Sequence, residues 1–591
     1  MNIELDPSST PDRDELDLDV SVAKSLFVGR ITEENLFPYP RIGADEAETL
    51  AMVSNSLDNF LQDNQEDFPR WDRESAQPEA FLKSLRKLGL FGLIIPEDYG
   101  GIGLSNAGYT RVVEQLSSYD SSAALTVTAH SSIGMKGLLL FGTDEQKARY
   151  LPKLASGEMI AAFCLTESGS GSDAASVKTK AEKNQDGSWT LNGEKIWITN
   201  GGIADFYTVF ARTGNDAGEL SAFFVERSWR GVNTGAKEDK MGIRASSTTS
   251  VSFSDVTVPA ENLLGRQGQG FKIAMSILNN GRTGLGGGSV GGMKACIALA
   301  TAQALERKQF GQSIAEFGLI KTKIAQMAID CFAAESVVWM VAHYIDSGCN
   351  DYSMEAAISK VFASEAMQRV ANEALQIAGG NGYMKEFPYE QIVRDSRILT
   401  IFEGTSEILR LYIALSGMKE AGRLMEELAE SVEDVFNNPI KGLGVLSEYA
   451  GRRIAQITPF RRDKMVSCVP ATLRNEALIY DKYASELGRV ADVLLRRHGK
   501  EIVSKQLAMK RLADIVIDLF VGLSVLARAS SFTDDGETRY QQAINVAKLF
   551  TQQAKRRMNQ NFRRIMRNED DDLKQLAQFI FSERAYPWDV L

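Results

Sequence analysis

The sequence predicts an α+β protein, mostly α, in which helices precede and follow a central antiparallel β region. Apolar residues recur at three- and four-residue steps in both flanking parts, as they do on one face of a helix. The middle part instead contains short runs rich in β-branched and aromatic residues, bounded by turn signals. A chain of 591 residues also exceeds one hydrophobic core, so several domains are expected.

An N-terminal helical domain is expected at residues 46–160, where AETLAMVSNSLDNFLQD has helical periodicity. A β domain is expected at 161–265, and Asn192-Gly193 within it predicts a hairpin between two short alternating runs. A C-terminal four-helix bundle is expected at 266–421, where SIAEFGLIKTKIAQMAIDCFAAESVVWMVAHYI is typical of a bundle helix. The strand and helix alternation of a doubly wound fold does not occur.

Three further segments complete the expected organisation. Residues 1–45 are polar and punctuated by proline, which indicates an arm over the surface. Residues 422–470 are predicted to be a linker with an amphipathic segment, because several glycines, prolines and arginines interrupt the periodicity. Helical periodicity returns at 471–591 and predicts an extra helical domain.

Composition narrows the function. A net charge of −11, from 66 basic and 77 acidic side chains, argues against a nucleic-acid partner. No metal site is expected, because there are 3 histidines and the cysteines lack paired spacing. The acidic N-terminal sequence has the features of neither a signal peptide nor a transit peptide, and no apolar run long enough to span a bilayer is recognised. A bacterial cytoplasmic location is therefore expected.

Five short segments have compositions that suit a bound ligand. They are FCLTESGSGSD (163–173), WITNG (197–201), RKQFG (307–311), QIAGGNGY (376–383) and IFEGTSEI (401–408). The first offers backbone N–H groups and hydroxyls to a polar ligand, and the second places an aromatic ring near a strand end. The third sets a guanidinium beside an aromatic, which suits a phosphate-bearing ligand with a ring. Each segment alone has an ordinary alternative: a surface loop, a core tryptophan, a solvated arginine or a helix stop.

Glu403 is the candidate catalytic base. It lies between apolar Phe402 and a polar turn that begins at Gly404, where a carboxyl group could be partly desolvated. Desolvation raises the pKa of a carboxyl group towards neutrality and makes it a usable base. The alternative is an acidic residue placed for the dipole at a helix N-terminus.

Taken together, the five segments resemble the acyl-CoA dehydrogenases in order and approximate spacing. The resemblance covers about residues 50–420, most densely 130–420, and extends weakly through the C-terminal block. A second helical domain marks the very-long-chain branch of that family, and AHSSIGMKGLLLFGTDEQKARYLPKLASGE, ILNNGR and ISKVFASEA also resemble that branch. Two positions depart from the family pattern, since Pro is common where Ser168 stands and position 407 varies among Gln, Asp and Glu.

The resemblance implies FAD as the cofactor, held partly across a homodimer interface. The residues it would assign to the flavin and the rest of FAD are Phe163, Leu165, Thr166, Gly171, Ser172, Trp197, Thr199, Arg307, Phe310, Gln376, Gly380, Thr405 and Glu407. The residues it would assign to the acyl-CoA are Ser172, Asn279, Arg282 and Gly404.

The resemblance also implies the reaction. Glu403 would take the α-proton of a fatty acyl thioester while the β-hydrogen leaves as hydride to FAD, giving a trans-2-enoyl-CoA in β-oxidation. The backbone N–H of Glu403 and a ribityl hydroxyl would stabilise the developing enolate. Some family members carry the base where Gly281 stands; glycine has no carboxylate, so Glu403 is left, with Arg282 expected to keep it ionised.

Three alternatives stay open on sequence grounds, and the simplest is a generic helical binding module without flavin. An acyl-CoA oxidase would pass electrons to oxygen, whereas the resemblance favours electron-transferring flavoprotein, docked near Trp197. A scaffold protein of the same fold would have an assembly role, although the intact Glu403 argues against a purely structural one.

Substrate length and membrane attachment are also expected from the resemblance. Ala124 and Thr128 would lie at the end of an acyl tunnel where very-long-chain members have glycines, which favours medium-to-long chains. Residues 436–464 carry four arginines and two lysines between apolar residues at roughly helical steps. From periodicity alone, a helix packed on the catalytic domain with a solvated basic edge fits at least as well as a basic amphipathic segment in the headgroup region. The resemblance favours the second interpretation, and so predicts peripheral contact with the inner membrane.

Overall fold

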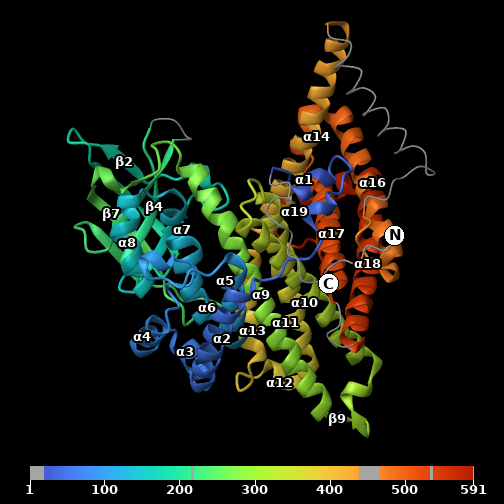
Figure 1. Cartoon of the computed structure of the whole chain (residues 1–591), viewed down its shortest axis with the longest axis horizontal. Helices are drawn as coiled ribbons and strands as arrows, with labels where there is room; N and C mark the ends of the chain where they lie inside the picture. The colour runs from blue at the N-terminus through green and yellow to red at the C-terminus, as the bar shows by residue number, and fades with distance from the viewer. Residues whose placement is uncertain (1–18, 215–218, 438–465, 533–536, 590–591) are drawn as a thin grey trace. The chain divides into compact units, whose positions relative to one another are not determined.

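A computed structural model describes residues 19–214, 219–437, 466–532 and 537–589 (Figure 1). The chain divides into two compact units. One is formed mainly by Tyr39–Ile408, and the other combines Val20–Pro38 with Leu409–Leu591. The first unit contains the expected order of helices, strands and helices, which confirms the α+β, mostly α fold class.

The first unit begins with short and medium helices that share a core with the following sheet. Their bounds are α2 Ala44–Asn64, α3 Phe68–Glu74, α4 Glu79–Lys87, α5 Asn106–Tyr119, α6 Ser121–Thr128, α7 Lys136–Phe141 and α8 Asp144–Ser156. Leu57, Leu61 and Leu85 from the helices and Val251 from the sheet belong to one buried cluster. Burial of these apolar side chains is the main source of stability for this part.

The β region has the strand order β6-β7-β3-β2-β4-β5-β8. The strands are β1 Ala161–Cys164, β2 Lys180–Lys183, β3 Trp189–Thr199, β4 Phe206–Arg212, β5 Leu220–Glu226, β6 Val232–Lys237, β7 Thr248–Val258 and β8 Leu263–Leu264. Most pairs are antiparallel as expected, but β4 pairs in parallel with both β1 and β2.

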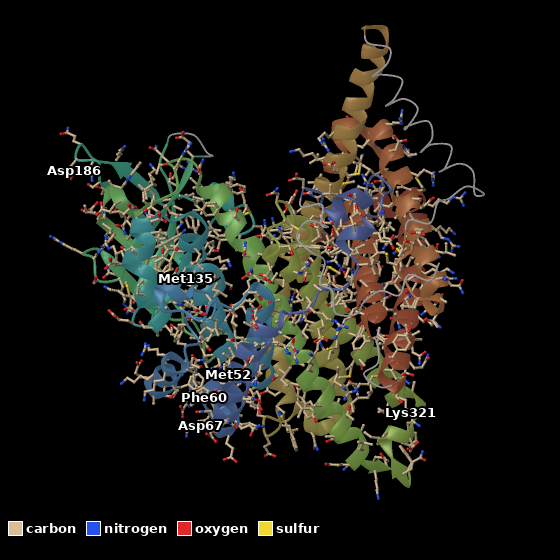
Figure 2. The ribbon with its side chains drawn as sticks, in the orientation of Figure 1. Met52, Phe60, Asp67, Met135, Asp186 and Lys321 are labelled. Carbon is tan, nitrogen blue, oxygen red and sulfur yellow. The ribbon has the colours of Figure 1, made fainter. Side chains whose placement is uncertain are left out.

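The hairpin predicted at Asn192-Gly193 is wrong. Both residues lie inside β3, where the pairing with β7 shifts register between Leu191 and Gly193. Asn192 exchanges hydrogen bonds with Asp255 on β7, at 3.0 and 2.8 Å, so the dipeptide forms a bulge. The turn lies between β2 and β3 instead, and its Asp186 projects at the outer end of the sheet (Figure 2).

Long helices follow the sheet. They are α9 Gly270–Glu306, α10 Gly318–Asp346, α11 Ser353–Ala378, α12 Gly380–Tyr383, α13 Tyr389–Ser396 and α14 Ser406–Asn437. A short hairpin, β9 Lys308–Gln309 with β10 Gln312–Ser313, separates α9 from α10. α10 is long and apolar enough to cross a membrane by length and composition, contrary to the sequence expectation, but 61% of its most apolar window is buried. It is therefore interpreted as a core helix of the bundle.

α9 contains the run GLGGGSVGG, although glycine costs about 0.8–1.0 kcal/mol relative to alanine inside a helix. Some of these glycines allow neighbouring helices to approach closely. A Cβ on Gly291 would lie 1.9 Å from the backbone oxygen of Glu114, and one on Gly287 would lie 2.8 Å from that of Thr110. Both neighbours belong to α5, so α5 and α9 pack backbone against backbone.

Two boundaries predicted from the sequence differ from those in the second unit. α14 continues to Asn437, so the linker predicted from residue 422 does not begin there; helical periodicity in KEAGRLMEELAESVEDVFN outweighs the interruptions that follow. The predicted surface arm is also wrong for residues 20–38. α1 Val22–Leu26 buries Val22, Leu26 and Phe27, and the Phe27 ring lies where a Cβ on Gly417 would be.

The remaining helices of this unit confirm the extra C-terminal helical domain. They are α16 Arg474–His498, α17 Gln506–Ser531, α18 Glu537–Met566 and α19 Asp570–Glu583. The predicted amphipathic segment 436–464 lies, from residue 438 on, outside the described residues.

Candidate active site

Glu403 lies in a tight turn between the 3₁₀ helix η7 Arg397–Thr400 and α14. Its backbone φ is +55°, and that of Gly404 is +95°. A left-handed conformation is uncommon for a residue with a side chain, and such strain persists only where the surroundings hold it. The turn directs the carboxylate towards α9, where a Cβ on Gly281 would lie 3.4 Å from Oε1.

The surroundings of Glu403 make it a candidate base. Its Oε2 is buried and has no hydrogen-bond partner among the described residues. Burial raises the pKa of Glu403 to about 7, while the positive charges of Arg282 and Lys360 oppose that rise. The charge of Arg282 thus acts in the direction that the sequence predicted, because it favours the ionised form of Glu403. A carboxyl group with a pKa near neutrality is suited to accept a proton at physiological pH.

Glu403 lines a mostly apolar cavity, called here the Glu403 cavity. Its walls come from α5, α6, α9, α11 and the α13–η7 segment. It is lined by Val113, Ser117, Ser121, Ala124, Leu125, Thr128, Ser132, Ile243, Gly281, Gly284, Leu285, Gly288, Gly292, Met367, Asp395, Ser396, Ile398, Leu399, Phe402 and Glu403. Ala124 and Thr128 are thus among the lining residues, and their predicted place at the end of an acyl tunnel stays a prediction.

Four glycines of α9 face the Glu403 cavity at helical spacing, namely Gly281, Gly284, Gly288 and Gly292. Gly281 lies beside the carboxylate, whereas a Cβ on Gly292 would lie 2.7 Å from Cε of Met367. The cavity therefore follows the axis of α9 away from Glu403. From Gly281 to Gly292 the rise is about 16 Å, at about 1.5 Å per residue.

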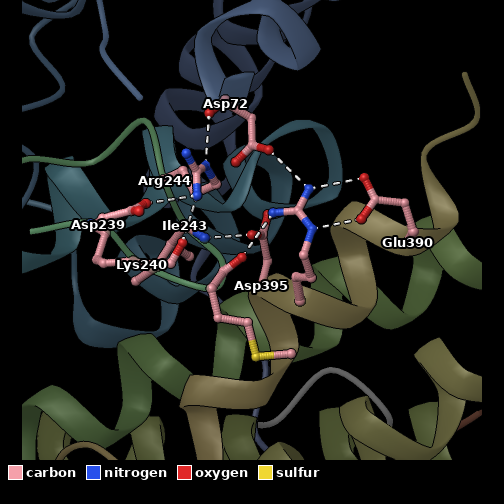
Figure 3. Close-up of polar contacts among 9 residues, drawn as sticks. Asp72, Asp239, Lys240, Ile243, Arg244, Glu390 and Asp395 are labelled. Carbon is pink, nitrogen blue, oxygen red and sulfur yellow. Dashed lines mark hydrogen bonds and ion pairs between the residues drawn. The ribbon is translucent and has the colours of Figure 1, made fainter. Parts of the chain in front are cut away.

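A charged cluster adjoins the wall of the cavity (Figure 3). Arg394 pairs with Glu390 through two hydrogen bonds and with Asp72 at 2.9 Å, and Asp395 accepts a hydrogen bond from the backbone of Ile243. Burial raises the pKa of Asp395 to about 7. These contacts tie α3, the segment before β7 and α13 together, and so fix the wall to which Asp395 and Ile243 contribute.

The segment 163–172, which begins at the end of β1, is anchored to the residues of β3 that precede Trp197. Lys195 is fully buried and its Nζ lies 2.7 Å from Oε1 of Glu167 and 3.1 Å from the backbone oxygen of Leu165. The Ile196 N–H donates to the Thr166 carbonyl at 3.0 Å. The structure therefore brings Leu165 and Thr166 to the end of β3 that carries Trp197 and Thr199. Phe163, on β1, instead packs against Phe210 on β4.

The residues around Trp197 and the nearby loop form an exposed surface. Trp197 is 63% exposed with φ +56°, and Gly171 and Ser172 are exposed. A Cβ on Gly169 or Gly171 would meet nothing within 4 Å. An exposed indole beside a loop with accessible backbone and hydroxyl groups provides a face for a planar, polar ligand.

A second group of predicted residues lies at the far end of the bundle. Arg307 and Phe310 follow the C-terminal end of α9, and Gln376 and Gly380 lie where α11 ends and α12 begins, at the same end of the bundle in Figure 1. Phe310 is 94% exposed. Arg307 lies about 39 Å along α9 from Gly281, at about 1.5 Å per residue. Within one chain these four residues are therefore not brought to Glu403.

The last predicted residues surround Glu403 itself. Arg282 is buried and donates to Asn279 Oδ1 at 2.5 Å, one turn back on α9. Thr405 accepts a hydrogen bond from the Ile408 N–H and so caps α14, while Glu407 is exposed on its first turn. Sequence reasoning missed Lys195, Lys360 and three of the glycines facing the cavity, Gly284, Gly288 and Gly292. Only the glycines had a visible signal, since their spacing of three and four residues marks one face of a helix.

Comparisons with known proteins identify the family of the chain. Sequence models of the acyl-CoA dehydrogenase N-terminal, middle and C-terminal domains match residues 47–158, 162–256 and 268–418. A model described as the ACAD9/ACADV C-terminal domain matches residues 471–586. The chain thus combines the three-domain body of one family with the extra domain of one of its branches.

Individual relatives extend the match to nearly the whole chain. The very long-chain specific acyl-CoA dehydrogenase of Bos taurus is 42% identical over 551 residues, which cover 92% of this chain and 83% of that protein. A crystal structure of an acyl-CoA dehydrogenase complexed with FAD from Bacillus anthracis has a TM-score of 0.80 at 32% identity, covering 96% and 97% of the two chains. Butyryl-CoA dehydrogenase from Megasphaera elsdenii has a TM-score of 0.61 at 37% identity, covering 63% of this chain and 98% of its own. The chain therefore belongs to the acyl-CoA dehydrogenase family and is an enzyme that dehydrogenates fatty acyl-CoA.

Proposed function

We propose that this enzyme dehydrogenates medium-to-long-chain acyl-CoA with Glu403 as the base, FAD as the cofactor and electron-transferring flavoprotein as the acceptor. The observation that carries the proposal is the buried Oε2 of Glu403 at the head of the Glu403 cavity. An apolar cavity with one poised carboxylate suits the removal of a proton from a carbon next to a thioester.

The residues present fit FAD. The exposed Trp197 and the open loop 163–172 suit a planar ring system joined to a polar chain, and the exposed Arg307 and Phe310 suit its phosphates and a second ring system. FAD supplies a hydride acceptor when it is bound. Because Arg307 and Phe310 lie far from Glu403 along α9, we infer that they serve the cofactor of a second copy, which makes a homodimer the functional form.

The chain's own residues account for the proton transfer. Arg282 and Lys360 stabilise the carboxylate of Glu403, while burial keeps its pKa near neutrality, so that it is both ionised and basic. The turn at Glu403 and Gly404 sets the direction of the backbone N–H of Glu403, which we assign to the substrate carbonyl oxygen as that oxygen gains negative charge. Ser172, Asn279 and Arg282 are assigned to contacts with the acyl-CoA.

The Glu403 cavity supports the proposed chain length. An extended alkyl chain with C–C bonds of about 1.5 Å advances roughly 1.3 Å per carbon, so a rise of about 16 Å along α9 holds about a dozen carbons beyond the reacting pair. Ala124 and Thr128 narrow the opposite wall. Chains near sixteen carbons should therefore fill the cavity, and longer ones should gain nothing further.

The decisive experiment is Glu403→Gln. The amide is nearly isosteric but cannot accept the proton, so the variant should retain FAD and bind acyl-CoA while dehydrogenation falls by about 10²–10⁴-fold or more. Flavin absorption measures cofactor content, and anaerobic flavin bleaching by saturated acyl-CoA measures the reaction. Turnover within tenfold of wild type would refute Glu403 as the base.

A further inference from the structure

Lys360 lies on α11, next to the turn that carries Glu403. Its side chain is fully buried, and its Nζ donates to the backbone oxygen of Gly404 at 2.8 Å. Burial lowers the pKa of Lys360 to about 8. A lysine with no access to solvent is costly to place unless its charge and its donors are used.

The hydrogen bond from Lys360 to the Gly404 carbonyl lies in a segment whose backbone conformation is unfavourable. Glu403 and Gly404 both have positive φ, and the segment from Ile401 to Thr405 is neither helix nor strand. Fixing the Gly404 carbonyl restricts the turn in which the carboxylate and the backbone N–H of Glu403 both originate. A left-handed residue persists at a functional site only where its neighbours over-determine its conformation.

The charge of Lys360 has a second effect on Glu403. The charged groups that act on Glu403 come from two helices packed around it, Arg282 on α9 and Lys360 on α11. Tyr109 on α5 also lies within electrostatic range, with a neutral phenol. Lys360 is itself influenced by Glu403, Arg282, Glu365 and Glu407. Loss of the ammonium group would leave Arg282 as the one cation from these elements that opposes protonation of Glu403.

We propose that Lys360 is a positioning residue for the dehydrogenation, holding the Glu403–Gly404 turn through the Gly404 carbonyl and keeping the Glu403 carboxylate ionised. The proposal rests on Glu403 as the base. The Glu403→Gln experiment tests that assignment separately, because it leaves Lys360 and its hydrogen bond in place.

Three variants of the FAD-bound enzyme separate these roles. Lys360→Met removes both the donor and the charge at similar volume, whereas Lys360→Gln keeps an N–H donor and removes only the charge. Lys136→Met is the matched control, because Lys136 is also buried, with its pKa also lowered to about 8, but its Nζ faces Asn106 at 3.4 Å. Cofactor content, kcat, KM and the pH profile of kcat/KM are measured for each with palmitoyl-CoA.

Lys360→Met should lower kcat by about tenfold to a hundredfold with KM within about threefold, because the turn is misplaced while the cavity is intact. The acid limb of its pH profile of kcat/KM should move to higher pH by about one unit, because the positive charge that opposes protonation of Glu403 has been removed. Lys360→Gln should recover part of kcat and keep the shifted limb, and Lys136→Met should alter neither. The proposal would be overturned if the acid limb of kcat/KM is unmoved in both Lys360 variants, or if the kcat of Lys360→Met is within about threefold of wild type. The same shift of the acid limb in Lys136→Met would also overturn it. If Lys360→Met loses FAD, the acid limb of Lys360→Gln decides.

Discussion

Replacing Gly288 with leucine should shorten the acyl chain that the enzyme accepts. Gly288 lines the Glu403 cavity seven residues beyond Gly281, a rise of about 10 Å along α9. At roughly 1.3 Å per carbon, about eight carbons beyond the reacting pair fit before the new side chain is reached. Decanoyl-CoA should therefore still fit, and palmitoyl-CoA should lose the burial of about five methylene groups.

The expected size of the effect follows from that length. Each methylene that stays out of an apolar site costs about 0.8 kcal/mol, so five cost about 4 kcal/mol. At about 1.36 kcal/mol per factor of ten, the ratio of kcat/KM for palmitoyl-CoA to that for decanoyl-CoA should fall by up to about a thousandfold. The fold should tolerate the change, because leucine is the better helix former and the nearest atom to a Cβ there is Oγ of Ser117, at 2.9 Å, which can rotate.

The assay is the chain-length profile of kcat/KM for saturated acyl-CoAs from eight to about twenty carbons, a range chosen to bracket the rise of α9. Gly286→Ala on the same helix is the control, because its Cβ would meet Cγ2 of Val338 at 2.6 Å on α10 instead of entering the cavity. The control should lower stability and leave the profile unchanged. A palmitoyl-to-decanoyl ratio of folded Gly288→Leu within about threefold of wild type would refute the assignment of this face to the acyl chain.

Three other predictions concern the reaction and its setting. The kcat/KM of the wild type should rise about tenfold per pH unit up to about pH 7 and then level off. The reason is that the base must be ionised, and burial raises the pKa of Glu403 to about 7. A flat pH profile of kcat/KM from about pH 5.5 to 8 would contradict this. The substrate-reduced enzyme should react slowly with oxygen and quickly with electron-transferring flavoprotein in stopped-flow mixing, whereas rapid peroxide formation matched to substrate oxidation would identify an oxidase. Anionic liposomes at low salt should float the wild type but not a variant with Arg452, Arg453, Arg461 and Arg462 changed to Glu, since each cation near the surface contributes about 1 kcal/mol; equal flotation of both would exclude these arginines as the anchor.

The features that the sequence predicted well are those set by local patterns. Helical periodicity located the long helices, whereas Glu403 was assigned as the base only through the resemblance of IFEGT to the family motif, and that assignment stays a prediction. The hairpin at Asn192-Gly193 was mispredicted because the partner that decides its conformation, Asp255 on β7, is distant in sequence. A turn signal indicates only which backbone conformations a dipeptide can adopt. In this chain the long-range pairing of β3 with β7 stabilises a bulge at Asn192-Gly193 instead of a hairpin turn.

The residues that sequence reasoning missed at the site share the same cause. Lys360 precedes the Gly404 carbonyl by 44 residues, and no spacing rule connects a lysine on one helix with a turn that far along the chain. The burial of Phe27 likewise depends on Gly417, which lies in another part of the chain. Such residues acquire their roles from tertiary packing, so their chemistry becomes visible only once the fold is known.

The glycine-rich run of α9 shows how one residue type serves two purposes on different faces of one helix. Gly287 and Gly291 face α5, where a methyl group would overlap backbone oxygens that cannot move aside. Gly284, Gly288 and Gly292 face the Glu403 cavity, where the nearest atoms belong to side chains. Alanine at the first pair should therefore cost stability through overpacking, and alanine at the other three should return up to about 1 kcal/mol of helix propensity while narrowing the cavity. Glycine on the cavity face lowers helix propensity, but it leaves the space along α9 that a cavity of this length requires.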